Sequence, residues 1–103
     1  MYRGTTPTIS FKINTDLDLN TLAECWVTFE TRLGTREKTF DMSDLIIDPE
    51  TKTISVTMSQ EDTLYFTAGT LQIQIRLRTT DDLAYASDIQ EMTMNGILKD
   101  GEI

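Results

Sequence analysis

Apolar residues alternate with polar ones along much of this chain, and this period of two constrains the fold more than any other feature. The clearest case is the run 71–78, in which four apolar positions, Leu71, Ile73, Ile75 and Leu77, alternate with Gln72, Gln74, Arg76 and Arg78. Successive side chains of a β-strand point to opposite faces, so this pattern places one face on a core and the other in water. The run therefore predicts a half-buried antiparallel strand.

The same alternation occurs elsewhere. Residues 9–13 and 54–58 each carry three apolar side chains at every second position. Residues 24–33 alternate too, with Cys25, Val27 and Phe29 on one face and Trp26 on the other. Trp26 therefore points away from the apolar row of its own strand. It either packs beneath a loop, which is the interpretation we favour, or marks an exposed contact.

Turn signals separate these strands. Residues 33–36, 48–51 and 79–82 contain the Gly, Pro and Asp residues that tight turns prefer. In the last predicted strand the parity of the apolar residues slips, and a bulge within residues 87–90 would restore it.

One short helix is expected where Ser59 is followed three residues later by Asp62, a spacing close to that of a capping box. Short strands at about 8–12-residue spacing, with turns between them, predict an all-β fold. We expect an immunoglobulin-like antiparallel β-sandwich of about seven strands, with one short helical turn crossing between the sheets. The 103 residues are expected to form a single β-sandwich domain over residues 1–103.

Composition narrows the function classes. The chain has no His and one Cys, and 9 Lys+Arg stand against 17 Asp+Glu, for a formal net charge of −8. Without His there is no imidazole base and no His-ligated zinc, and one Cys supports neither an internal disulfide nor a Cys-cluster metal site. A charge of −8 repels phosphate backbones and anionic lipids. We therefore expect no cofactor, and neither nucleic acid nor membrane as a partner. Residues 1–7 lack the apolar stretch of a signal peptide, so we also expect synthesis in a reducing cytosol.

Residues 14–20 superficially copy the alternating oxygen ligands of a calcium loop. An EF-hand loop also needs Gly at its sixth and Glu at its twelfth position, and neither is present whether one counts from Asp16 or from Asn14. We expect a solvated loop with Leu17 and Leu19 turned inward, and a looser calcium-binding loop remains the alternative.

Three other features could carry chemistry. The pairs Glu61-Asp62 and Asp81-Asp82 could serve glycoside hydrolysis, but caps and turns also favour acidic residues. Cys25 lies on an apolar strand face, where a lone thiol is more often packed than reactive. We therefore expect no enzymatic activity.

The polar side of the strand at 71–78 forms a stripe of Gln72, Gln74, Arg76 and Arg78. Together with Trp26 these residues are the candidate partner-binding residues, and a merely solvated sheet face is the alternative reading of the stripe.

The order of segments carries a resemblance. Residues 3–8 lead into a strand; then follow Val27-Thr28-Phe29, the segment 53–63 with its Ser-x-x-Asp cap, the strand 71–76 and a closing stretch that contains Ser87. This layout resembles the small β-sandwich proteins encoded among the tail and baseplate genes of phages and prophages of Gram-positive bacteria. It is also similar to the N-terminal immunoglobulin-like domain of the phage baseplate upper protein.

The resemblance implies a non-enzymatic structural protein of the virion, an adaptor or assembly module that binds other virion proteins and self-associates as a homo-oligomer. It implies no catalytic residues. The alternative from another class is a small module that binds a carbohydrate or another host-surface ligand through exposed aromatic residues.

Overall fold

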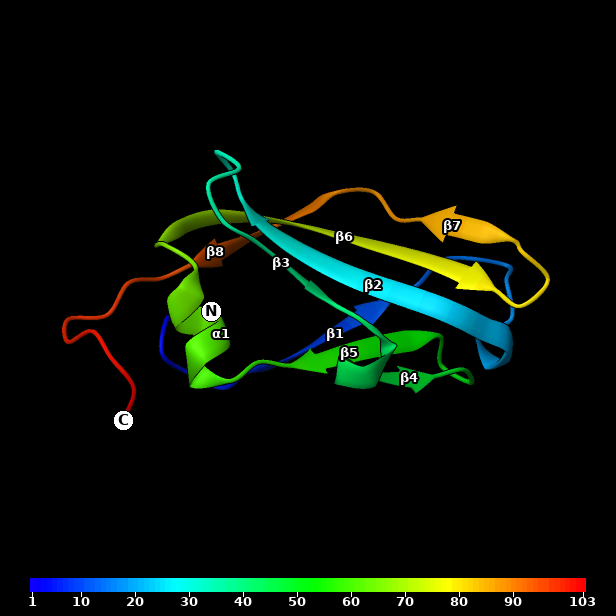
Figure 1. Cartoon of the computed structure of the whole chain (residues 1–103), viewed down its shortest axis with the longest axis horizontal. Helices are drawn as coiled ribbons and strands as arrows, with labels where there is room; N and C mark the ends of the chain where they lie inside the picture. The colour runs from blue at the N-terminus through cyan, green and yellow to red at the C-terminus, as the bar shows by residue number, and fades with distance from the viewer.

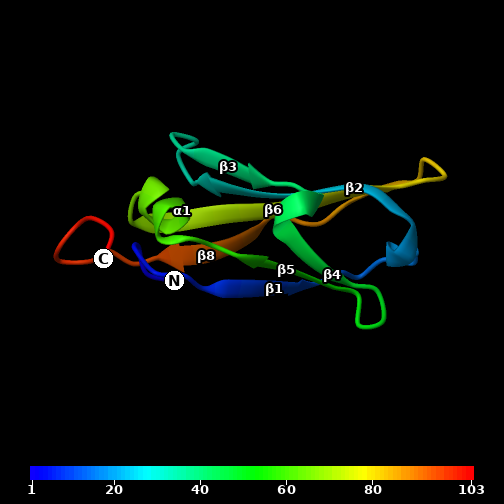
Figure 2. The same ribbon diagram turned by 60° about the horizontal axis from the view of Figure 1, so that its bottom comes forward.

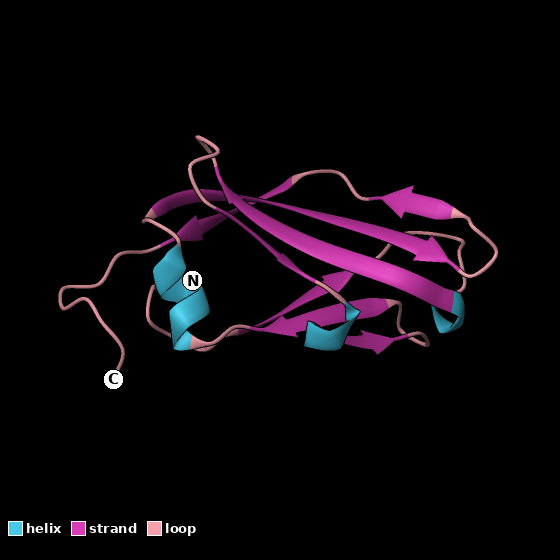
Figure 3. Ribbon diagram, viewed as in Figure 1, coloured by secondary structure: helices cyan, strands magenta, loops and turns pink.

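Two antiparallel sheets face each other across an apolar core in the computed structural model, which describes residues 1–103 (Figures 1 and 3). The eight strands are β1 (Thr8–Lys12), β2 (Leu22–Thr31), β3 (Glu37–Phe40), β4 (Leu45–Asp48), β5 (Thr53–Thr57), β6 (Gly69–Thr79), β7 (Ala84–Ala86) and β8 (Gln90–Met94). One helix, α1 (Gln60–Tyr65), connects β5 of one sheet to β6 of the other. Short 3-10 turns occupy Leu19–Thr21 and Met42–Asp44.

The order of the strands confirms the predicted sandwich. One sheet has the order β1-β5-β4, and the other has the order β3-β2-β6-β7, with β8 also paired to β6. In immunoglobulin-like sandwiches one sheet carries strands B, E and D and the other carries C′, C, F and G. The chain reproduces both orders when β1 takes the place of strand B and β7 and β8 share the place of strand G. The position of strand A, beside β1, is empty.

A bulge divides the last strand of the predicted sandwich in two, which raises the strand number from about seven to eight. Arg76 faces Ala86 and Ile73 faces Gln90, so two residues of β6 lie opposite three residues, 87–89. Ser87 holds the bulge because its N–H donates to the Ile75 carbonyl at 2.8 Å and its hydroxyl accepts from the Ile75 N–H at 3.0 Å. The predicted register slip is therefore confirmed.

The core consists of the apolar positions that alternate in the sequence. Sixteen apolar residues are buried between the sheets, and Figure 2 shows the two layers edge-on. Phe29 lies at their centre with no exposed surface, and its ring centroid is 5.7–6.4 Å from those of Phe11, Phe40 and Phe66. Aromatic rings at these distances and tilts attract each other beyond the gain from burial.

Helix α1 begins with the predicted capping box. The Ser59 hydroxyl accepts from the Asp62 N–H at 3.1 Å, and the Asp62 carboxylate accepts from the Ser59 N–H at 2.8 Å. Arg3 holds the other end of the helix, because its guanidinium donates to the carbonyls of Leu64 and Phe66 at 2.9 and 2.8 Å. These bonds satisfy backbone groups that a helix end leaves without partners.

The two ends of the chain lie together beside α1, at the opposite end of the molecule from the β6–β7 turn (Figure 1). Tyr2 and Asn95 form an isolated parallel bridge there, with hydrogen bonds from Arg3 N–H to the Asn95 carbonyl at 3.0 Å and from Asn95 N–H to the Met1 carbonyl at 2.7 Å. No helix has the length and apolar character needed to span a bilayer.

Candidate functional site

The outer face of the five-stranded sheet carries all five of the predicted partner-binding residues. The odd-numbered residues of β6 from Leu71 to Leu77 are buried, so the even-numbered residues point outward. Neighbouring side chains on β2 are aligned with them: Trp26 faces Arg76, Thr28 faces Gln74, Glu30 faces Gln72 and Glu24 faces Arg78. The predicted residues therefore share one face, and their role in binding stays a prediction.

Trp26 is exposed, so the interpretation that it packs beneath a loop is wrong. Its relative exposure is 43%. Trp26 lies on β2, in the middle of the sheet, and faces Arg76 on the neighbouring strand β6. The guanidinium carbon of Arg76 is 5.6 Å from the centre of the indole ring. A cation over the face of a Trp ring is attracted by the ring electrons. The indole is thus covered on one side by a charged group and open on the other.

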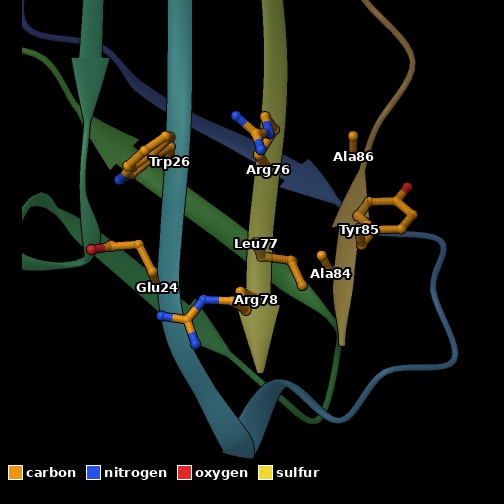
Figure 4. Close-up of a pocket in the computed structure, with 8 residues that line it drawn as sticks. All are labelled: Glu24, Trp26, Arg76, Leu77, Arg78, Ala84, Tyr85 and Ala86. Carbon is orange, nitrogen blue, oxygen red and sulfur yellow. The ribbon is translucent and has the colours of Figure 1, made fainter. Parts of the chain in front are cut away.

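A hollow of about 590 Å³ opens beside this pair (Figure 4). Trp26, Arg76 and Arg78 lie on one side of it and the short strand β7 on the other, where Ala84 and Ala86 face the two arginines. The hollow exists because the alanine side chains are too short to fill the space over β7. The sequence signal for this hollow is the small side chain at two alternate positions, Ala84 and Ala86.

The two arginines differ in their surroundings. The Arg78 guanidinium lies 3.9 Å from the Asp82 carboxylate, and both groups are at least half exposed. Such an exposed pair contributes little to stability. Arg76 forms no ion pair with any acidic residue of the chain. Its charge is therefore available to an acidic group from outside.

A second hollow, of about 250 Å³, lies farther along the same face toward α1. Its polar lining comes from Thr28, Glu30 and Glu37 on one side and Gln72 and Gln74 on the other, with exposed Ile89 beside them.

Carboxylates form a row across this end of the face. Glu37 of β3 faces Glu30 of β2, which faces Gln72 of β6, which faces Glu91 of β8. None of the three glutamates forms an ion pair. Like charges directly opposite each other destabilise a sheet, so the Glu30–Glu37 pair in this row is a local conflict that the fold leaves unrelieved. The sequence alone does not reveal it, because the row depends on the register between four strands.

The acidic pairs considered for catalysis serve local structure. Asp62 caps α1 and forms an ion pair with Lys38, and Asp81 accepts from the Thr79 hydroxyl in the β6–β7 turn. Burial alone would raise the pKa of Asp62, but hydrogen bonds from Lys38 and Ser59 outweigh it and lower the pKa below its ordinary value. These two pairs lie at opposite ends of the molecule (Figure 1).

The loop at residues 14–20 turns Leu19 into the core, as predicted, and packs half-buried Leu17 against it. Asp18 accepts from the backbone N–H of Asn20 at 2.9 Å, and this bond lowers the pKa of Asp18. No three acidic or thiol side chains of the chain come together as a group that could hold a metal ion.

Cys25 lies in the core without exposed surface, and burial raises the pKa of its thiol to about 11. A thiol in this state is a packing residue, because the thiolate is the nucleophilic form.

Comparison of the chain with protein-family models, with curated proteins and with solved structures finds no match. The phage resemblance in the order of segments thus stays a prediction.

Proposed function

We propose that the chain is a non-enzymatic structural protein of a phage virion that joins other tail or baseplate proteins through the outer face of the five-stranded sheet. The phage setting rests on the order of segments described above. The binding face rests on a single observation: an exposed Trp26 stacked against an unpaired Arg76 at the centre of a broad sheet.

Trp and Arg are the residues most enriched among those that carry the binding energy of protein interfaces. Trp26 supplies a rigid apolar surface, and Arg76 supplies a charge that is already desolvated on one side by the indole. The adjoining hollow, with Ala84 and Ala86 at its edge, has room for a side chain of the partner. Association through this face requires no reacting group.

Mass spectrometry of purified phage particles from the strain that carries the gene tests this proposal. We expect the wild-type chain in the particles. Trp26→Ala should lower its content at least about tenfold, because central interface residues each contribute about 2 kcal/mol or more. Ile46→Ala is the matched control, since Ile46 is an exposed apolar residue, 67% accessible, on the other sheet. Absence of the chain from particles, or equal content of the Trp26 and Ile46 variants, would refute the proposal.

Carbohydrate binding is the second candidate, and Trp26 beside a polar hollow is the observation in its favour. Of the tyrosines, Tyr2 and Tyr65 lie near α1 and not on this face, whereas half-buried Tyr85 lines the same hollow and packs against the core. Trp26 is then the one exposed ring on which a sugar would stack. A glycan array with the wild-type chain and Trp26→Ala distinguishes the two, because a Trp26-dependent hit on the array favours the carbohydrate.

A further inference from the structure

Arg76 and the row of Glu37, Glu30 and Glu91 lie apart along the strands on the outer face of the five-stranded sheet. Arg76 lies toward the β6–β7 turn, where Arg78 faces Glu24 and is 3.9 Å from Asp82, and the acidic row lies toward α1. Gln72, in the middle of the row, and Arg76 lie four positions apart along β6, which corresponds to about 13 Å. The face thus carries an unpaired cation at one place and three unpaired carboxylates at another.

We propose that this face binds the same face of a second copy of the chain, with the strands of the two copies antiparallel, to form a two-fold symmetric dimer. The inference rests on the proposed function and narrows it, because it assigns the contact of this face to a second copy of the chain as the partner within the tail or baseplate. In a two-fold contact, residue i of one copy meets residue j of the other and j meets i, so the surface has to be complementary to itself.

A two-fold axis that passes over Gln74 and Thr28, perpendicular to the strands, produces this complementarity. Counting two residues along β6 in each direction from Gln74 places Arg76 of one copy over Gln72 of the other. Glu30 and Glu91 flank that Gln72 on the neighbouring strands. Each Arg76 therefore meets two carboxylates of the second copy, and the symmetric contact repeats this pairing on the other side of the axis.

Apolar groups lie near the same axis. Ile89, which is 59% exposed, borders the hollow next to Gln74, so the two copies of Ile89 approach each other in this arrangement. Because Trp26 lies beside Arg76, it is placed over the acidic row of the second copy, and this row covers the indole. The contact then has an apolar centre with charged pairs around it, the usual anatomy of a protein interface.

The strands have to be antiparallel because of the charge of the chain. With a net charge of −8 per copy, two copies repel each other unless the contact brings opposite charges together. If the strands ran parallel, the axis would place arginine against arginine and the acidic row against itself, which costs several kcal/mol in an interface. Only the antiparallel arrangement places Arg76 of each copy against the carboxylates of the other copy.

The face has the area of a small protein interface. With each strand of the sheet taken at its own length, about 3.4 Å per residue and about 4.8 Å between strands give a flat area of roughly 540 Å². Standard protein interfaces bury about 600–1,000 Å² per partner, so the contact has to use nearly the whole face.

Exchange of charges between two variants tests the dimer. Arg76→Glu places a glutamate against Glu30 and Glu91 in both halves of the contact, and Glu30→Arg places an arginine against Arg76 in both halves. Sedimentation equilibrium of the full chain should give a dimer for the wild type, and each variant alone should show a dissociation constant at least about tenfold higher. A one-to-one mixture of the two variants should recover the dimer, because both halves then pair opposite charges.

Lys12→Glu is the matched control, since it makes the same change of charge on the other sheet and should leave the dimer unchanged. Far-UV circular dichroism establishes that each variant is folded. A wild-type chain that stays monomeric up to millimolar concentration overturns the inference, as does a mixture that associates no better than its components. Trp26-dependent content of the chain in particles would still support the proposed function in that case, so the two can fail separately.

Discussion

Lys38 of β3 forms an ion pair with Asp62 of α1, although 24 residues separate them in the sequence. Lys38 occupies a position of the same parity as buried Phe40, so its side chain points to the core side of the sheet. There it reaches the carboxylate that also caps the helix. The ion pair thus links α1, which connects the two sheets, to β3, the edge strand of the five-stranded sheet.

Replacement Asp62→Asn should lower the free energy of unfolding at neutral pH and have a smaller effect in acid. The pKa of Asp62 is lowered in the folded state. Its contribution is therefore fully present above the unfolded pKa of about 3.9 and is lost as the pH falls through the lower, folded value. Urea unfolding of both proteins at several pH values measures the difference. Asp16→Asn, in an exposed loop position, is the control, and a difference that grows toward low pH would contradict the assignment.

Removal of the helix cap by Ser59→Ala should destabilise the protein by about 1 kcal/mol, because the N–H of Asp62 loses its acceptor. Chemical unfolding monitored by circular dichroism measures this. Thr67→Ala removes the hydroxyl of an exposed residue beyond the end of α1 and should change stability by less than about 0.5 kcal/mol. Equal effects of the two substitutions would show that the cap contributes nothing.

Substitution Phe29→Ala should be the most damaging change in the chain. The side chain is fully buried and contacts three other phenylalanine rings, so its loss should cost about 3–5 kcal/mol. That is a large share of the about 5–15 kcal/mol by which domains are stable. Leu33→Ala, at an exposed position in the β2–β3 turn, is the comparison, and thermal unfolding measures both. A Phe29 variant as stable as the Leu33 variant would refute the central role of this ring.

The Cys25 thiol should resist alkylation and disulfide exchange in the folded protein. With a pKa of about 11, it is almost entirely protonated at pH 8, and it has no exposed surface. A chromogenic disulfide reagent at pH 8 should therefore react with the urea-unfolded chain and leave the native chain untouched. Rapid reaction of the native chain would mean that β2 opens readily.

Fluorescence of Trp26, the only tryptophan, should report self-association directly. The indole is partly exposed in one copy and becomes covered in the proposed dimer. Its emission should therefore move to shorter wavelength as the concentration of wild-type protein rises. The emission of Arg76→Glu should stay constant over the same range, and a concentration-independent emission of the wild type would contradict the dimer.

The strands could be predicted because each one buries every second residue, as the run from Leu71 to Leu77 shows. The bulge at Ser87 could be predicted from the slip in parity for the same reason. The acidic row could not, because Glu30, Glu37 and Glu91 are brought together by the register of strands that are distant in the sequence. The two 3-10 turns were also not foreseen. They form where Asp18 and Asp41 accept backbone N–H groups two residues ahead.

The parallel bridge between Tyr2 and Asn95 has a mechanical consequence. The two segments run in the same direction, so a force that pulls the ends of the domain apart drags them past each other in opposite directions. Both backbone hydrogen bonds of the bridge then stretch together, whereas bonds that are opened like a zipper break one after the other. A domain held between larger components would therefore resist tension first at this bridge, before the load reaches either sheet.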